Sequence, residues 1–200
     1  GVADDLQALH PVRVTPDDDR ALAVYPFFHV AGLGVALAHL QAGAQLVLPP
    51  ATDAEQIWRL VEEERVSVLG LSPTLVRALR PHGDPDADLS SLRIIVTTGE
   101  PWNPEPYRWL FERIGERRRP IINCSGGTEV AACFLSPSPA IPIKECSLGC
   151  PALGMAMDVV DADGTSLVGT GEVGELVCRK PFPGMTRGFW RDPERYLDTY

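Results

Sequence analysis

The sequence predicts an α/β fold, in which a parallel sheet with helices on both faces is followed by part of a β-rich, antiparallel subdomain. Short apolar segments alternate with amphipathic segments between residues 21 and 130, which is typical of a parallel sheet covered by helices. From about residue 137, proline and glycine become frequent and helical periodicity is lost. We therefore divide the chain into an α/β subdomain, residues 1–136, and a partial β-rich subdomain, residues 137–200.

Apolar segments that end at prolines, glycines or polar residues are predicted to form the strands. The parallel sheet is assigned residues 21–27, 45–48, 66–71, 92–97 and 120–123. In the second subdomain, residues 157–160 and 172–178 are predicted to pair as antiparallel strands around turns, the first of them at residues 161–164.

The predicted helices lie between the strands. Residues 30–42 are small and apolar, which indicates a tightly packed helix. Thr52 begins the next helix, because Thr52 and Glu55 have the spacing of a capping box. Ser72, followed by proline at the first helical position, begins a third helix that runs to about residue 79.

A fourth helix is predicted to begin at Asn103, which is followed by proline, and to run to about residue 119. Its last residues, 117–119, are all arginine. Cations stabilise the negative end of a helix, and this role explains the cluster better than a binding patch does.

Composition excludes several classes of protein. The 200 residues are 44% hydrophobic and 22% charged, which is typical of a globular chain. The net charge of −9 argues against a general nucleic-acid binder, but leaves room for a small nucleotide held by backbone donors. No segment approaches the roughly 20 apolar residues that a membrane-spanning helix needs, so we expect no membrane insertion.

Five cysteines without a CxxC pattern indicate free thiols in a reducing, cytoplasmic setting. Cys146 and Cys150 are four residues apart, but a zinc site needs two further ligands, so a structural metal is not favoured. The first five residues, GVADD, lack methionine and a cationic stretch. We therefore expect no signal peptide and interpret the chain as a fragment.

Three segments follow predicted parallel strands and are rich in glycine, proline and polar residues: 26–29, 98–101 and 123–129. Ligands bind beyond the carboxyl ends of such strands. In the third segment, paired glycines allow close approach of a ligand to the backbone, and Thr128 can donate to a phosphate oxygen. Glu129 fits a phosphate site only if a hard cation such as Mg²⁺ lies between them.

Simpler interpretations of these segments stay open at this point. Residues 125–129 equally fit a polar turn that leads from a strand into a helix, with Glu129 in the first helical turn. Residues 98–101 fit a plain turn before the helix at Asn103. An isolated histidine such as His29 is more often a packed or solvent-edge residue than a base.

Four segments, in this order, resemble the adenylate-forming (AMP-binding) superfamily: 25–32 (YPFFHVAG), 97–101 (TTGEP), 123–129 (NCSGGTE) and 174–176 (GEL). The sequence is most similar to the branch that contains acetyl-CoA synthetase, because residues 102–104 and 187–200 also resemble that branch. The resemblance covers nearly the whole chain from about residue 20, as an internal fragment of the large N-terminal domain.

The resemblance assigns roles to individual residues. Adenine would lie against Gly99, Glu100 and Pro101, and the carboxamide of Asn123 would bond its edge. Thr128 would bond the α-phosphate and act in catalysis together with Glu129, which would hold Mg²⁺. The remaining expected nucleotide contacts are Cys124, Ser125, Gly126 and Gly127, and the expected acyl and CoA pocket contains His29, Thr98 and Gly126.

The implied protein is an ATP-dependent carboxylate–CoA ligase that uses ATP, Mg²⁺ and coenzyme A to form acyl-AMP and then acyl-CoA. The Gly-rich phosphate loop with its lysine would precede residue 1, and the ribose-binding aspartate and the catalytic lysine would follow Tyr200. We expect the chain alone to be inactive. An adenylating ligase that loads a carrier protein, and a non-catalytic adenylate-binding or interaction module, are the alternatives.

Two residues depart from the family pattern. Ser125 stands where many members have an aromatic residue that stacks on adenine, which serine cannot do. Gly126 stands where acetate-specific members carry a tryptophan that shortens the acyl pocket. The glycine predicts an acid longer or bulkier than acetate.

Overall fold

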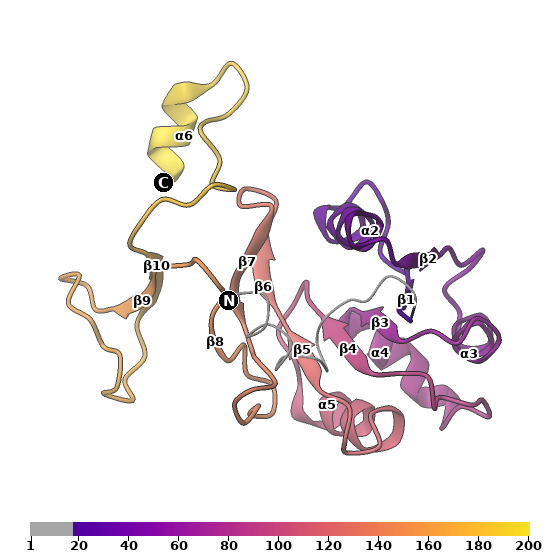
Figure 1. The fold of residues 1–200 in the computed structure, drawn as a ribbon. Helices are drawn as coiled ribbons and strands as arrows, with labels where there is room; N and C mark the ends of the chain where they lie inside the picture. Colours follow the sequence, from indigo (N-terminus) through magenta and orange to yellow (C-terminus); the bar gives the residue numbers. More distant parts are fainter. Residues whose placement is uncertain (1–17) are drawn as a thin grey trace, which may run out of the picture.

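The computed structural model describes residues 18–200. Its centre is a five-stranded parallel sheet in the order β2-β1-β3-β4-β5 (Figure 1). The strands are β1 (Arg20–Leu22), β2 (Gln45–Val47), β3 (Val68–Leu71), β4 (Ile94–Thr97) and β5 (Ile121–Asn123). All five predicted parallel strands are confirmed, although each is shorter than its apolar segment.

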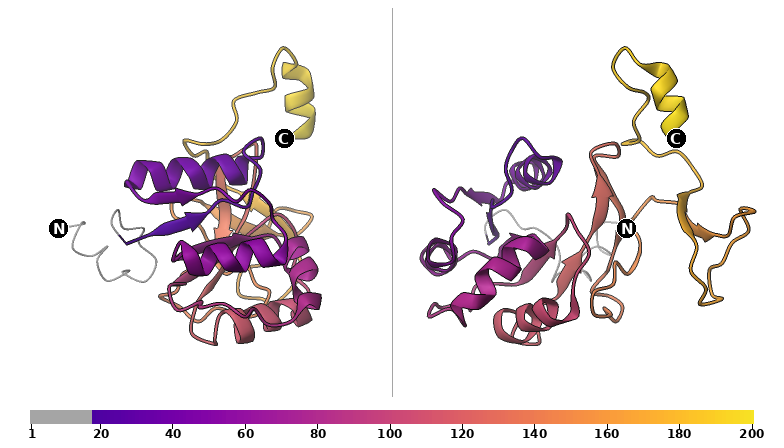
Figure 2. Two further views of the ribbon diagram at one scale, coloured as in Figure 1. Left: turned by 90° about the vertical axis from the view of Figure 1, so that its right-hand side faces the viewer. Right: turned by 180° about the vertical axis from the view of Figure 1, so that it is seen from behind.

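Helices cover both faces of this sheet, as predicted. Figure 2 shows α2 (Val30–Ala42) on one side of the strands and three further helices on the other. These are α3 (Ala54–Glu63), α4 (Pro73–Leu79) and α5 (Pro104–Trp109), and α5 continues as a π-helical turn, η3 (Leu110–Ile114). A short 3₁₀ turn, η2 (Arg80–His82), follows α4.

The main core lies between the sheet and α3, α4 and α5. Fully buried aliphatic side chains from strands and helices meet there, including Leu69, Ile95, Ile57, Val76 and Leu110. The opposite face has a smaller cluster, made by Ala21, Val68, Ile94 and Ile122. The larger cluster includes Ile95 of β4 and Ile121 of β5, and the carboxyl ends of these two strands lead into the candidate site.

Helix α2 is packed tightly on one side only, which corrects the prediction of a tightly packed helix. A Cβ at Gly32 would lie 2.3 Å from the Pro26 carbonyl oxygen, so the helix touches the preceding backbone there. On the other side, Leu33, Leu37 and Leu40 are 49%, 57% and 62% exposed. The apolar composition of α2 therefore predicted the helix correctly but not how deeply it is buried.

Side-chain hydrogen bonds cap the first turns of α3 and α4. The predicted cap of α4 is confirmed, since Ser72 Oγ accepts a hydrogen bond from the Leu75 amide at 3.1 Å. The predicted cap of α3 at Thr52 is wrong by one residue. Asp53 is the N-cap, and its carboxylate accepts from the Gln56 amide at 3.0 Å. Asp53 and Gln56 have the same three-residue spacing as Thr52 and Glu55, so spacing alone could not separate the two starts.

The fourth helix is shorter than predicted. It ends at Ile114 rather than at residue 119, because Gly115 is followed by Glu116 and Arg117 with positive φ angles of 50° and 56°. The arginines therefore lie beyond the last helical turn, but the expected role at the helix end holds for Arg119, whose guanidinium donates to the carbonyl oxygen of Ile114, the last helical residue. Arg119 is only 2% exposed and donates hydrogen bonds to the carbonyl oxygens of Leu89, Leu92 and Ile114.

Antiparallel strands follow the parallel sheet, as predicted. One sheet contains β6 (Ser125–Gly127), β7 (Ala132–Ser136) and β8 (Cys150–Pro151), and a hairpin contains β9 (Met157–Val160) and β10 (Glu175–Cys178). The first of these sheets joins residues on both sides of the division proposed between residues 136 and 137, which stays a prediction.

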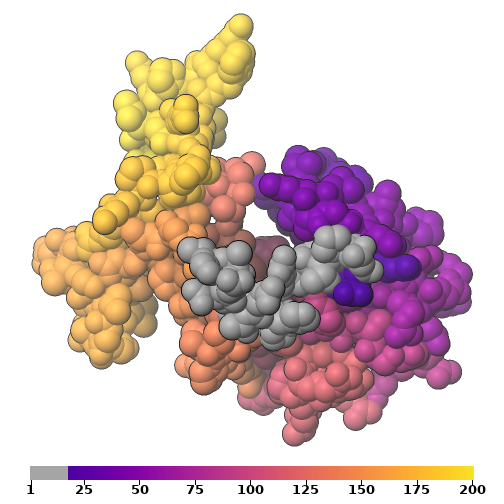
Figure 3. All heavy atoms as spheres, viewed as in Figure 1, coloured from indigo at the N-terminus to yellow at the C-terminus, as the bar shows by residue number. Residues whose placement is uncertain are grey.

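The predicted absence of helices after residue 137 is wrong. Helix α6 (Pro193–Thr199) is capped by Asp192 and stabilised where Tyr196 packs on Phe189 with ring centroids 5.6 Å apart. Figure 3 shows this C-terminal segment projecting from the body of the molecule. Within residues 18–200, no helix is long and apolar enough to cross a membrane.

Candidate functional site

Two of the three predicted ligand-binding segments meet at one edge of the sheet. Thr97 and Asn123 are register partners at the ends of β4 and β5, so the segments that follow leave the sheet side by side. The Cys124 amide donates to the Thr97 carbonyl oxygen at 2.7 Å, and the Thr98 hydroxyl donates to the Cys124 carbonyl oxygen at 2.9 Å. The turn at residues 98–101 and the segment at 123–126 therefore form one unit.

A cavity of about 300 Å³ lies between these two segments. Its volume is at the lower end of the range of small-molecule sites. Predicted site residues make up most of its wall: Thr98, Gly99, Glu100, Pro101, Asn123, Cys124, Ser125 and Gly126. Cys146 and Leu148 complete the wall, and no local pattern predicted a place at the site for either residue.

The first wall is a turn with an unusual backbone. Gly99 has a φ angle of 107°, which side-chain-bearing residues rarely adopt, and a Cβ there would have no neighbour within 4 Å. The carboxylate of Glu100 accepts a hydrogen bond from the Thr74 amide at 2.9 Å and also bonds the Thr74 hydroxyl and Arg77. These hydrogen bonds lower the pKa of Glu100, and they tie the turn to the first residues of α4.

A buried network of polar side chains connects the same turn to the end of β5. The indole nitrogen of Trp102 donates to Thr97 Oγ1 at 3.0 Å, and the Thr97 hydroxyl donates to Asn123 Oδ1 at 3.2 Å. Asn123 Nδ2 then donates to the Ser147 carbonyl oxygen at 3.5 Å. The Asn123 carboxamide thus lies in the cavity wall with a fixed orientation. Sequence reasoning missed Trp102 and Ser147 as the supports of this residue.

The second wall is the irregular start of a hairpin. The ladder between β6 and β7 shifts register between Ser125 and Gly126, which is a β-bulge. A Cβ at Gly126 would lie 2.1 Å from the Ala132 carbonyl oxygen. Gly126 is therefore required by the contact between the two strands, whatever the size of the ligand.

Thr128 and Glu129 lie beside this cavity but not in its wall. Both are exposed residues of the turn 128–131 that joins β6 to β7, so the interpretation of Glu129 as part of a helix start is wrong. The Glu129 carbonyl oxygen accepts from the Thr186 amide at 2.8 Å, while its carboxylate stays accessible to solvent. A solvated carboxylate on a turn can reach a hydrated cation.

His29 is not part of the cavity wall either. It is exposed and caps α2, because its Nδ1 accepts a hydrogen bond from the Ala31 amide at 3.1 Å. Gly127 is also absent from the wall. The structure thus brings together eight of the predicted site residues and leaves His29, Gly127, Thr128 and Glu129 outside the enclosed part.

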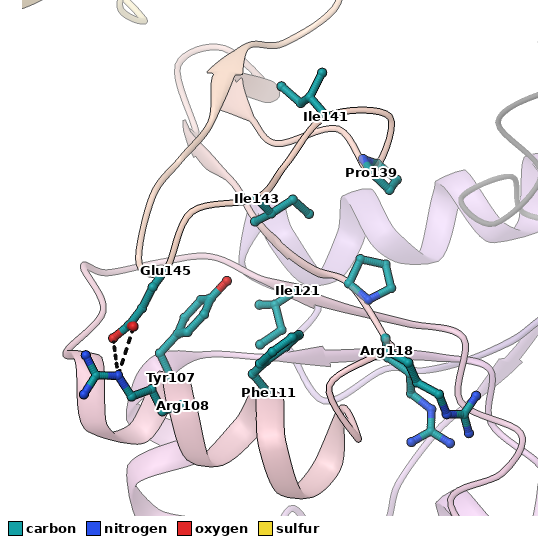
Figure 4. A pocket seen from close by; sticks show the side chains of 11 residues that line it. Tyr107, Arg108, Phe111, Arg118, Ile121, Pro139, Ile141, Ile143 and Glu145 are labelled. Carbon is teal, nitrogen blue, oxygen red and sulfur yellow. Dashed lines mark hydrogen bonds and ion pairs between the residues drawn. The ribbon is translucent and has the colours of Figure 1, made fainter.

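A second cavity, of about 520 Å³, contains none of the predicted site residues. Figure 4 shows the side chains of Phe111, Ile121 and Ile143 facing this space, with Arg108 paired to Glu145 at its edge. The segment that contributes Ile143 and Glu145 here contributes Cys146 and Leu148 to the smaller cavity. The larger cavity is mainly apolar and offers few polar groups with which to orient a nucleotide.

Comparison with known proteins places the site in a family. The model of the AMP-binding enzyme family matches residues 2–190, so the chain belongs to the AMP-binding enzyme family, and the resemblance stated above is confirmed.

Curated relatives give a more particular similarity. The chain is 39% identical to the acetyl-coenzyme A synthetase of Methylobacillus flagellatus over 177 residues, which cover 83% of this chain and 26% of the relative. It is 40% identical over 157 residues to the acetyl-coenzyme A synthetase of Chromobacterium violaceum and 38% identical to that of Laribacter hongkongensis. Each of those two matches covers 76% of this chain and 24% of the relative. The chain therefore spans about a quarter of the length of these relatives.

Proposed function

We propose that this chain is the nucleotide-binding centre of an ATP-dependent carboxylate–CoA ligase. The observation that carries the proposal is the single cavity between residues 98–101 and 123–126, at the carboxyl ends of two neighbouring parallel strands. The relatives' name, acetyl-coenzyme A synthetase, supports the same class of reaction.

The proposed reaction has two steps. A carboxylate oxygen attacks the α-phosphorus of ATP, the bond to the β-phosphate oxygen breaks, and pyrophosphate leaves. The thiol sulfur of coenzyme A then attacks the acyl carbon, loses its proton, and displaces AMP. Neither step requires a covalent bond to the protein, so its contribution is orientation of the reactants and stabilisation of charge.

The residues of this chain fit those tasks. The exposed backbone at Gly99 offers a flat contact for adenine, and the fixed Asn123 carboxamide would bond the adenine edge. Thr128 would donate to the α-phosphate from the exposed turn. In this scheme Glu100 holds the turn in place through its hydrogen bonds with Thr74 and Arg77, and does not make a strong contact with adenine.

Glu129 is the proposed ligand of Mg²⁺. No group of three or more His, Cys, Asp or Glu residues that could hold a metal occurs in the described part of the chain. A single accessible carboxylate nevertheless fits Mg²⁺, which proteins commonly hold through one or two carboxylates together with substrate phosphates and water. When bound there, Mg²⁺ would neutralise charge on the transferring phosphate.

The size of the carboxylic acid substrate is a separate part of the proposal. The prediction of an acid larger than acetate rests on the missing side chain at Gly126, and the contact with Ala132 gives that glycine a structural reason of its own. The relatives are named for acetate. We keep the larger acid as a hypothesis and place acetate beside it as the reference substrate.

The test is a panel of carboxylic acids, from acetate to longer and bulkier ones, with ATP and coenzyme A, run on the complete gene product and followed as released pyrophosphate. We expect acid-dependent release of pyrophosphate and formation of the CoA thioester. Adenylate formation without use of coenzyme A would instead support a ligase that loads a carrier protein. Absence of pyrophosphate release with every acid would contradict the proposal and favour the non-catalytic module.

A further inference from the structure

A later segment of the chain holds the turn 128–131, which carries the proposed ligand of Mg²⁺. The Glu129 carbonyl oxygen accepts a hydrogen bond from the Thr186 amide at 2.8 Å. A Cβ at Gly184 would lie 2.4 Å from the Val130 carbonyl oxygen, so the two backbones are in direct contact there. The turn is therefore restrained from outside the β6–β7 hairpin to which it belongs.

Helix α6 restrains this segment through Tyr196. The Tyr196 hydroxyl donates a hydrogen bond to the Thr186 carbonyl oxygen at 3.1 Å. The Tyr196 ring packs against Phe189 and Tyr200, with centroid distances of 5.6 Å and 5.4 Å. Thr186 thus accepts from Tyr196 through its carbonyl group and donates to Glu129 through its amide. Two hydrogen bonds in series connect α6 to the turn.

The carboxylate of Glu129 depends on this backbone for its place. It is exposed and lies over Gly127, because a Cβ at Gly127 would be 2.7 Å from Glu129 Oε2. A turn that is already ordered loses less conformational freedom when its carboxylate binds a cation, so an ordered turn binds the cation more tightly. Restraint of the turn should therefore raise the affinity for Mg²⁺ more than the rate at saturating Mg²⁺.

We propose that Tyr196 is a positioning residue for the Mg²⁺ site, and that it acts through Thr186 on the backbone of Glu129. This inference rests on the proposed role of Glu129 as the metal ligand. The Tyr196 hydroxyl is hydrogen-bonded to Thr186, and Tyr196 is absent from the wall of the candidate cavity. Its effect on the site therefore passes through the turn.

Tyr196→Phe tests this proposal, because it removes the hydroxyl and keeps the ring. The full gene product is assayed for exchange of pyrophosphate into ATP as free Mg²⁺ is varied, at saturating ATP and acid. We expect the free Mg²⁺ concentration for half-maximal exchange to rise about fivefold, and the rate at saturating Mg²⁺ to stay within about twofold, as the loss of one net hydrogen bond predicts. The acid concentration for half-maximal exchange should not change.

Tyr200→Phe is the matched control. Tyr200 belongs to the same group of rings, and desolvation followed by the charge of Glu129 raises its pKa, so it also lies close to the carboxylate. Its hydroxyl makes no hydrogen bond with residues 18–200, so we expect wild-type dependence on Mg²⁺. A rise equal to that in Tyr196→Phe would show that any change in the aromatic group disturbs the site, and would overturn the proposal.

A double variant separates action through Glu129 from an independent effect. Tyr196→Phe should add no further change to Glu129→Gln, because the carboxylate that it positions is then absent. Effects that multiply would overturn the proposal. Wild-type Mg²⁺ dependence in Glu129→Gln alone would instead refute the role of Glu129, which is a failure of the proposed function.

Hydrogen exchange of the same proteins, without metal or nucleotide, tests the connection independently of ligase activity. We expect Tyr196→Phe to speed exchange of the Thr186 amide and of the amides of Val130 and Ala131, which both donate to the Gly127 carbonyl oxygen. Tyr200→Phe should leave all three unchanged. Wild-type exchange in Tyr196→Phe would refute the connection, and faster exchange with wild-type dependence on Mg²⁺ would show that it only stabilises the turn. Either result would overturn the proposal.

Discussion

The hydroxyl of Thr98 donates a hydrogen bond to the carbonyl oxygen of Cys124 at 2.9 Å. This bond joins the turn after β4 to the segment after β5, and the backbone bond from the Cys124 amide to the Thr97 carbonyl oxygen lies directly beside it. Residues that are 26 positions apart in the sequence are thereby held together, and their two segments form the two walls of one cavity. The proposed nucleotide site depends on this junction.

The carboxylate of Glu129 is the first group to test. We expect Glu129→Gln to lower Mg²⁺-dependent adenylate formation about 100-fold or more, because a metal ion contributes several kcal/mol of charge stabilisation to phosphoryl chemistry. The measurement is acid-dependent exchange of pyrophosphate into ATP by the full gene product. Glu172→Gln is the matched control, since Glu172 is also an exposed carboxylate but lies far along the chain near β10. Equal exchange by the two variants would remove Glu129 from the metal role.

The junction between Glu100 and α4 predicts a dependence of stability on pH. Hydrogen bonds from Thr74 and Arg77 lower the pKa of Glu100 below its ordinary value of 4.5, so the folded state favours the ionised carboxylate. This contribution is fully present above pH 4.5 and is lost as the pH falls through the lower folded-state pKa. The difference in Tm between the wild type and Glu100→Gln should therefore be largest near pH 7 and shrink in acid. A difference that grows as the pH falls would contradict this account.

Two glycines in α2 should respond in opposite ways to the same substitution. Gly32→Ala places a Cβ 2.3 Å from the Pro26 carbonyl oxygen, and we expect a loss of about 1–3 kcal/mol in the free energy of unfolding. Gly34→Ala meets no atom within 4 Å, and we expect a gain of about 0.4–1 kcal/mol from the reduced freedom of the unfolded chain. Urea denaturation of both variants tests this pair, and equal effects would show that α2 does not pack against residues 25–26 as described.

Arg119 is expected to be essential for stability and not for binding. Its guanidinium donates to three carbonyl oxygens in the interior, and Arg119→Met removes all three bonds, although the Leu89 carbonyl oxygen keeps the bond from the Leu92 amide at 3.0 Å. We expect a loss of about 2 kcal/mol or more, since each unsatisfied buried acceptor costs about 1–3 kcal/mol. The neighbouring Arg118→Met is the control and should change stability by no more than about 0.5 kcal/mol, because Arg118 is exposed. Similar losses in both variants would contradict the assigned role.

The sequence predicted the parallel sheet well because the apolar segments of β3, β4 and β5 are buried on both faces and alternate with amphipathic helices. It also predicted that the segments after β4 and β5 would carry the site, because neighbouring parallel strands end at the same edge. The departures have local causes. The start of α3 cannot be assigned from spacing, because Thr52 and Asp53 are equivalent candidates for its cap. The π-helical turn at residues 110–114 leaves no signature in the hydrophobic periodicity of the sequence.

The supports of the site were harder to predict than the site itself. Glycine and proline in a turn give a strong local signal, as at Gly99 and Pro101. Trp102, Ser147 and Cys146 reach the site only through the tertiary fold, and no local pattern distinguishes them from other core or loop residues. The family resemblance assigned Glu100 to the nucleotide, whereas its hydrogen bonds lead to Thr74 and Arg77 of α4.

The central claim is that residues 98–101 and 123–126 hold the adenine nucleotide together. Photolabelling of the full gene product with 2-azido-ATP tests it directly, because the reactive group sits on the adenine ring itself. We expect label in the peptides that contain both of these segments, and we expect unlabelled ATP to suppress it. Label confined to peptides around Phe111 and Ile143, which line the larger cavity, would contradict the account.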